Sequence, residues 1–213
     1  MKPHADPSPK VLADVAAAVR NRQGHERPHL DEAVIRSVIE GSLVDRFIEE
    51  AQFAGMTTSR CPDGELVPHL DGLLNEHAGD GPVLLEPALA ATMPEIAAAR
   101  SFLTTPNEDE LYSAIAGVVS AEYGVAETGS LVRFSAPDRP RGFALLPPYV
   151  VFVLREGAIL PDLLDWLKMQ DSTGMPSEAV LVTGPSKTAD IGMKLVTGIH
   201  GPGEVHVIIV GDG

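Results

Sequence analysis

Apolar residues recur at helical spacing in the first half of the chain and in continuous runs in the second half. Spacing of three and four residues places apolar side chains on one face of a helix. We expect the second of four such helices to begin at Asp31 and Glu32, and the fourth to begin with a capping box at 105–108. The four faces comprise Val11, Leu12, Val15 and Val19; Val34, Ile35, Val38, Ile39, Phe47 and Ile48; Leu66, Leu70, Leu73 and Leu74; and Leu111, Ile115, Val118 and Val119.

Short β-branched or apolar runs predict strands. The runs are 56–61, 82–86, 131–134, 142–146, 149–154, 178–182 and 205–210. Continuous runs, unlike alternation of apolar and polar residues, favour strands covered on both faces, as in a mostly parallel sheet. Further helices are expected at 94–100, 161–169 and 189–196. Strand–helix–strand order of this kind predicts an α/β domain with three layers.

Length and local composition suggest one main domain with an arm. The chain has 213 residues, which fits a single core. A polar stretch with Gly24 and Pro28 follows the first predicted helix. We therefore predict an N-terminal helical arm over residues 1–30 and an α/β domain over residues 31–213.

The charge of the chain excludes several classes of partner. Thirty Asp and Glu residues against 16 Lys and Arg residues give a net charge of −14. Such a chain repels nucleic acids and anionic membranes unless it has a concentrated basic patch, and the sequence has none. The longest apolar run, 149–154, is far shorter than the roughly 20 residues of a membrane-spanning helix. With its polar, Pro-rich N-terminus, the sequence predicts a protein of the cytoplasm.

The sequence does not favour a metal or a redox cofactor in this chain. Cys61 is the single cysteine, and one thiol cannot form an internal disulfide or supply the ligands of an iron–sulfur cluster. Among the seven histidines only His25 and His29 have the H-x-x-x-H spacing, and Pro28 between them disfavours the helix that would bring both rings to one metal ion. We therefore expect Cys61 to be structural and predict no metal site.

The segment after the strand at 178–182 is the first candidate site. A Gly-Pro turn precedes hydroxyl groups and a lysine, and the N-terminus of the expected helix at 189–196 would offer N–H groups to an anion. Alternatively, a hydroxyl merely caps that helix and the lysine is solvated. The candidate anion-binding residues are Gly184, Pro185, Ser186, Lys187, Thr188 and Asp190.

Two other loops carry candidate residues. Glu127, Thr128 and Gly129 form a bend between extended segments, which presents a carboxylate and a hydroxyl or is simply a hairpin corner. His200 lies among three glycines, where a backbone can approach a ligand, although a loop histidine is more often solvated.

Three arginines flank a Pro-rich loop. Arg133, Arg139 and Arg141 would suit a carboxylate or phosphate ligand. Pairing with Asp or Glu is the commoner fate of such arginines, and the sequence leaves both readings open.

Taken together, these motifs resemble those of the lactate-utilisation (LUD) domain family. The resemblance lies in A-E-T-G-S at 126–130, L-L-P at 145–147, G-P-S-x-T-A-D-I at 184–191 and G-x-H-G-P at 198–202. It implies a fold like that of ribose-5-phosphate isomerase and CoA transferases. It also implies a role in oxidising L-lactate to pyruvate beside iron–sulfur partner proteins, which would hold the redox centres. The matching residues are Glu127, Thr128, Gly129, Gly184, Pro185, Ser186, Thr188, Asp190, His200, Gly201 and Pro202.

Three functions are compatible with this sequence. The first is an accessory subunit of an iron–sulfur-dependent lactate-utilisation system that binds a small carboxylate or phosphate at 184–190. The second is an interaction module whose acidic surface docks a partner. The third is an independent enzyme acting on a phosphorylated or thioester substrate, with Glu127 as the nucleophile by analogy with CoA transferases.

Overall fold

The computed structural model describes residues 8–20, 39–173, 176, 178–189 and 195–211. The chain divides into two units, residues 1–36 and 37–213. In the first unit, helix α1 (Ser8–Arg20) forms where the apolar spacing predicts it and exposes Val11, Leu12 and Val15. The boundary between an arm at 1–30 and a domain at 31–213 stays a prediction.

The second unit is built on a five-stranded sheet in the order β1-β11-β6-β3-β2, with every neighbouring pair parallel. Its strands are β1 (Thr57–Pro62), β2 (Val83–Leu85), β3 (Ala116–Ser120), β6 (Tyr149–Arg155) and β11 (Glu204–Gly211). The central strands are buried on both faces, because their side chains point alternately into two separate cores. The predicted α/β class with a mostly parallel sheet is confirmed.

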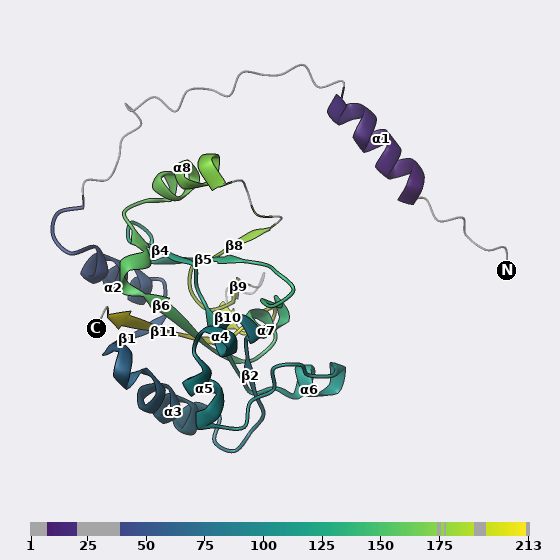
Figure 1. Ribbon diagram of the computed structural model, residues 1–213. Helices are drawn as coiled ribbons and strands as arrows, with labels where there is room; N and C mark the ends of the chain where they lie inside the picture. Colours follow the sequence, from purple (N-terminus) through teal and green to yellow (C-terminus); the bar gives the residue numbers. More distant parts are fainter. Residues whose placement is uncertain (1–7, 21–38, 174–175, 177, 190–194, 212–213) are drawn as a thin grey trace. The chain divides into compact units, whose positions relative to one another are not determined.

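Helices cover both faces of this sheet (Figure 1). One face packs against α3 (Leu66–His77), α4 (Pro87–Thr92) and α5 (Pro94–Ala99), and α3 follows a short 3₁₀ turn at Asp63–Glu65. The other face packs against α2 (Leu43–Phe53) and α7 (Gly142–Leu145). Phe47 of α2 and Leu74 of α3 are fully buried, and each such side chain contributes about 1.5–3 kcal/mol of stability.

A second, four-stranded sheet lies beside α2, with strand order β7-β4-β5-β8. Strands β4 (Tyr123–Val125) and β5 (Ser130–Phe134) pair antiparallel, as do β5 and β8 (Ala179–Val182). Strand β7 (Ile159–Leu160) follows the 3₁₀ turn Glu156–Ala158 and pairs parallel with β4. Trp166 of α8 (Leu163–Thr173) packs with Val125 and Val132 of this sheet.

Three predicted elements were wrong. The predicted helix through Leu111 and Val119 is a short helix, α6 (Glu108–Ser113), followed by β3, because Val118 and Val119 belong to a strand buried on both faces. The expected strand at 142–146 is helix α7. The second predicted helix is not continuous, because residues 39–42 are not helical and α2 begins at Leu43, where the Ser42 hydroxyl accepts a hydrogen bond from the Asp45 amide. Its predicted start at Asp31 lies outside the described residues.

The helix expected at 189–196 is also contradicted at both of its ends. Strand β9 (Lys187–Ala189) pairs antiparallel with β10 (Leu195–Thr197), and residues 190–194 lie outside the described residues. β-Branched residues at 188, 196 and 197 suit extended backbone. No helix begins in 187–189, so no helix N-terminus offers N–H groups to an anion there, and anion binding at 184–190 stays a prediction.

Candidate functional site

A chain of three hydroxyl groups joins two of the candidate loops. Antiparallel pairing sets Leu131 of β5 opposite Val182 of β8, so the residues flanking these positions also meet. The Ser130 hydroxyl lies 2.8 Å from the Thr128 hydroxyl and 2.7 Å from the Thr183 hydroxyl. Ser130 is buried, whereas Thr128 and Thr183 are exposed. This chain of three hydroxyl groups therefore presents a polar group to solvent at each of its two ends.

The two motif glycines let these loops pack on the last turn of α2. Gly129 has φ +63°, and a Cβ there would lie 2.2 Å from the Ala51 amide nitrogen. Gly184 has φ +98°, and a Cβ there would lie 2.5 Å from the Ala54 carbonyl oxygen. Both positions require glycine for conformation and for space. The end of α2 thus supports the site, a role that no sequence motif indicates.

Lys187 binds the C-terminal end of α2. Its Nζ donates a hydrogen bond to the Ala54 carbonyl at 2.7 Å and passes directly over Gly55. An ammonium group is favourable at this end of a helix, where carbonyl groups create partial negative charge. Two of its three N–H groups have no acceptor among the described residues. Lys187 therefore stabilises α2 and can still donate to a ligand.

The loop of His200 joins the same site through Ser186. The Ser186 amide donates to the Pro202 carbonyl at 2.8 Å, and the Gly198 amide donates to the Ser186 carbonyl at 2.9 Å. His200 is exposed on this loop. Backbone hydrogen bonds thus hold the 183–187 and 198–203 loops together.

The remaining predicted residues differ in how far the structure places them. Glu127 is half-buried beside Thr128, and its amide donates to the Pro161 carbonyl at 3.0 Å. Pro185 packs beside Gly55. Thr188 lies on β9, and Asp190 lies outside the described residues. The candidate site thus comprises Thr128, Ser130, Thr183, Ser186, Lys187 and His200, with Glu127 at its edge; we call it the hydroxyl site.

A histidine network fixes the strands that lead to the hydroxyl site. His206 of β11 binds the Thr57 hydroxyl through Nδ1 (2.9 Å) and the Ser59 hydroxyl through Nε2 (2.8 Å). His69 of α3 lies 2.7 Å from the Ser59 hydroxyl, and Thr57 donates to the Val205 carbonyl. Burial, together with electrostatic interaction with His69 and His77, lowers the pKa of His206 to about 4. His206 is therefore neutral at pH 7 and ties the start of β1 to the start of β11.

The three arginines near the Pro-rich loop are each paired with a glutamate. Arg133 is almost fully buried and lies 2.5 Å from Glu86, which is completely buried. Ion pairs of 2.6 Å and 2.9 Å join Arg139 to Glu122 and Arg141 to Glu178. Burial raises the pKa of Glu122, although the guanidinium of Arg139 opposes this shift. Of the two predicted roles for these arginines, the structure shows ion pairing with glutamate.

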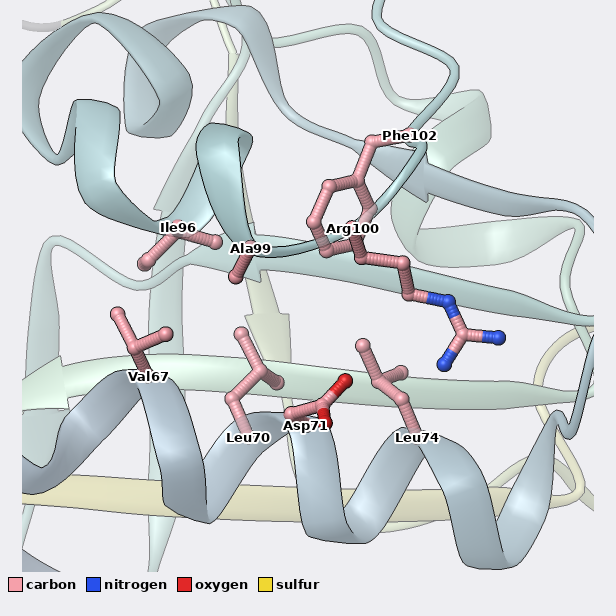
Figure 2. Close-up of a pocket in the computed structure, with 8 residues that line it drawn as sticks. All are labelled: Val67, Leu70, Asp71, Leu74, Ile96, Ala99, Arg100 and Phe102. Carbon is pink, nitrogen blue, oxygen red and sulfur yellow. The ribbon is translucent and has the colours of Figure 1, made fainter.

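A crevice between α3 and α5 is too small to bind a substrate. It is lined mainly by apolar side chains, together with Asp71 between Leu70 and Leu74 and with Arg100 beside Phe102 (Figure 2). Its volume of about 10 Å³ corresponds to a single water molecule at most.

The described part of the chain shows neither a metal cluster nor a membrane span. No group of three or more His, Cys, Asp or Glu side chains within it could hold a metal ion. Of the helices found there, none has the length and apolar character needed to cross a bilayer.

Comparison with known proteins identifies similar sequences and a similar fold. The LUD domain family model matches residues 44–210. Escherichia coli YkgG is 42% identical over 111 residues, which cover 50% of this chain and 48% of YkgG. Lactate utilization protein C is 38% identical over 101 residues in Bacillus licheniformis and 36% identical over 101 residues in Bacillus subtilis; both matches cover 45% of this chain and 42% of the relative. The chain thus spans about half the length of the curated relatives that it matches.

A solved structure shares the fold. A DUF162 family protein from Deinococcus radiodurans superposes with a TM-score of 0.60 at 20% identity, covering 79% of this chain and 96% of that one.

Proposed function

Because this chain belongs to the LUD domain family, we propose that it is an accessory subunit of an L-lactate utilisation system and binds a small carboxylate at the hydroxyl site. The observation that supports this proposal most strongly is the meeting of three separate motif loops in one place. The hydroxyl chain joins the loops of Thr128 and Thr183, and Ser186 joins the loop of His200. Lactate utilization protein C of two Bacillus species is similar to this chain.

The groups of the hydroxyl site suit a hydroxy acid. Lys187 supplies a positive charge and N–H donors for a carboxylate. The Thr128 and Thr183 hydroxyls can each donate to or accept from a ligand hydroxyl, and the buried Ser130 hydroxyl between them can reorient with either one. A hydroxy acid can use both kinds of group, because it carries an acceptor and a donor on adjacent carbons.

Oxidation of lactate to pyruvate requires a partner that accepts electrons. The reaction releases two electrons and two protons, and the single thiol of this chain cannot ligate an iron–sulfur cluster. We therefore assign the redox centres to iron–sulfur subunits of the same system. The role of this chain is to bind the acid or to dock those subunits.

Calorimetric titration with L-lactate and pyruvate tests the binding site. Lys187→Ala should weaken binding by about tenfold, because it removes the ammonium group that would pair with the ligand carboxylate. The matched control is Lys168→Ala, which removes an exposed lysine from α8. Equal affinity of Lys187→Ala, the control and the unchanged protein for both acids would contradict the site assignment.

A further inference from the structure

A cavity lies at the carboxyl ends of the central strands, whereas the hydroxyl site lies at the end of the sheet where these strands begin. The loops of that site lead into the starts of β1 and β11, whereas this cavity lies where β1, β11 and β6 end. Its volume is about 280 Å³, and Arg60, Cys61, Pro62, Glu156 and Gly211 line it. We call it the carboxyl-end cavity.

The position of this cavity is one at which parallel sheets bind ligands. After β1 the chain continues into α3 on one face of the sheet, and after β6 it continues through β7 into the core on the other face. Such divergence leaves a crevice outside the carboxyl ends of the strands, where ligands of open α/β sheets bind. A volume of about 280 Å³ lies just below the range of about 300–1,000 Å³ for ligand sites and restricts the occupant to a small molecule.

Charges of both signs surround the cavity. Arg60 lies 3.1 Å from Glu156 and 3.5 Å from Asp45, so one guanidinium serves two carboxylates. A second ion pair joins Arg155, the last residue of β6, to Asp63, the residue after β1. A simple anion would gain little here, because carboxylates outnumber guanidinium groups. A molecule with both a carboxylate and an ammonium group would match this arrangement.

Such a ligand could replace the ion pair at small cost. The side chains of Arg60 and Glu156 are 48% and 34% exposed, and ion pairs this exposed contribute little net stability. A ligand carboxylate would take the guanidinium of Arg60, and its ammonium group would take the carboxylate of Glu156. Both protein charges would then remain paired.

The remaining lining residues are uncharged and suit a small side chain. Burial and the neighbouring carboxylates of Glu65 and Asp63 raise the pKa of Cys61, so its thiol is neutral at pH 7. Gly211 leaves room beside Glu156, since a Cβ at this position would lie 3.6 Å from the Glu156 carboxylate. We propose that the carboxyl-end cavity binds a small zwitterionic α-amino acid, with its carboxylate on Arg60 and its ammonium group on Glu156.

Titration with L-alanine, L-lactate and pyruvate tests this proposal. The three molecules share a carboxylate and a methyl group and differ at the α-carbon, where only L-alanine carries an ammonium group. L-Alanine should bind saturably, and Arg60→Met or Glu156→Gln should each weaken its binding by about tenfold or more. Gly211→Val should do the same by filling the cavity while all charges remain. The control Arg141→Met, which breaks an exposed ion pair elsewhere, should bind L-alanine like the unchanged protein.

Two results would overturn the proposal. One is no saturable binding of L-alanine or L-valine up to about 10 mM, which corresponds to an affinity too weak for a specific site. The other is binding that survives Arg60→Met, Glu156→Gln and Gly211→Val alike. Amino-acid binding at this cavity and lactate binding at the hydroxyl site can be tested separately. Arg60→Met should leave lactate affinity unchanged, and Lys187→Ala should leave L-alanine affinity unchanged.

Discussion

Replacing Gly129 by alanine should destabilise the protein strongly, because the added methyl group would meet the backbone of α2. At φ +63° an L-residue costs about 1–2 kcal/mol more than glycine. The new Cβ would lie 2.2 Å from the Ala51 amide nitrogen and 2.5 Å from the Glu50 carbonyl carbon. Neither atom belongs to a flexible side chain, so the loop or the helix must move, and overpacking of this kind costs about 1–3 kcal/mol.

The expected total for Gly129→Ala is therefore about 2–5 kcal/mol, a large share of a typical stability of about 5–15 kcal/mol. Urea unfolding followed by circular dichroism measures it. The matched control is Gly72→Ala in α3, where a Cβ meets nothing within 4 Å. That control should stabilise the protein by about 0.5–1 kcal/mol, because alanine is the better helix former. Similar unfolding free energies for the two variants would refute the packing of the Gly129 loop on α2.

Three other predictions concern buried or reactive side chains. The pKa of His206 falls from 6.5 to about 4 on folding, so the unfolded chain binds more protons than the folded protein between these two pH values. The free energy of unfolding should therefore rise from pH 4 to pH 6.5, and the rise should be smaller in His206→Gln. Urea midpoints measured across this pH range test the prediction. Arg133→Met should lower the free energy of unfolding by about 3–5 kcal/mol, because it leaves the Glu86 carboxylate buried without its cation. Adding Glu86→Gln should recover part of that loss. Equal stability of the single and double variants would contradict the buried pair. Intact-protein mass spectrometry after incubation with acetyl-CoA should show no adduct, whereas a covalent thioester on Glu127 would favour the CoA-transferase-like enzyme.

The sequence predicts those parts of the fold that depend on local patterns. The runs at 149–154 and 205–210 are strands of a parallel sheet, because a strand covered on both faces needs apolar residues at nearly every position. The same reasoning fails where spacing is ambiguous. Val118 and Val119 fit a helical face together with Leu111, yet they lie in β3, which pairs with β6 and β2 and is buried on both faces. The specific likeness to ribose-5-phosphate isomerase and CoA transferases stays a prediction.

The candidate site is only partly predictable for a different reason. Each motif can be recognised in the sequence, but the contact of Ser130 with Thr183 depends on the antiparallel register of β5 and β8. The support given by Ala51 and Ala54 depends on where α2 ends, and alanines carry no signal of such a role. Lys187 shows most clearly what the sequence does not predict. The segment expected to lead into a helix N-terminus is strand β9, and the ammonium group of Lys187 binds the C-terminus of helix α2 instead.

The most direct test of the hydroxyl site is a double-mutant cycle on lactate affinity with Thr128→Val and Thr183→Val. Both substitutions preserve side-chain shape and remove a hydroxyl from the ends of one hydrogen-bonded chain. Each should weaken L-lactate binding by about three- to tenfold, the value of one hydrogen bond. If the two hydroxyls act through Ser130 as one site, the double variant should lose clearly less than the product of the single effects. Fully independent effects, or no effect of either substitution, would contradict a single site built from the two loops.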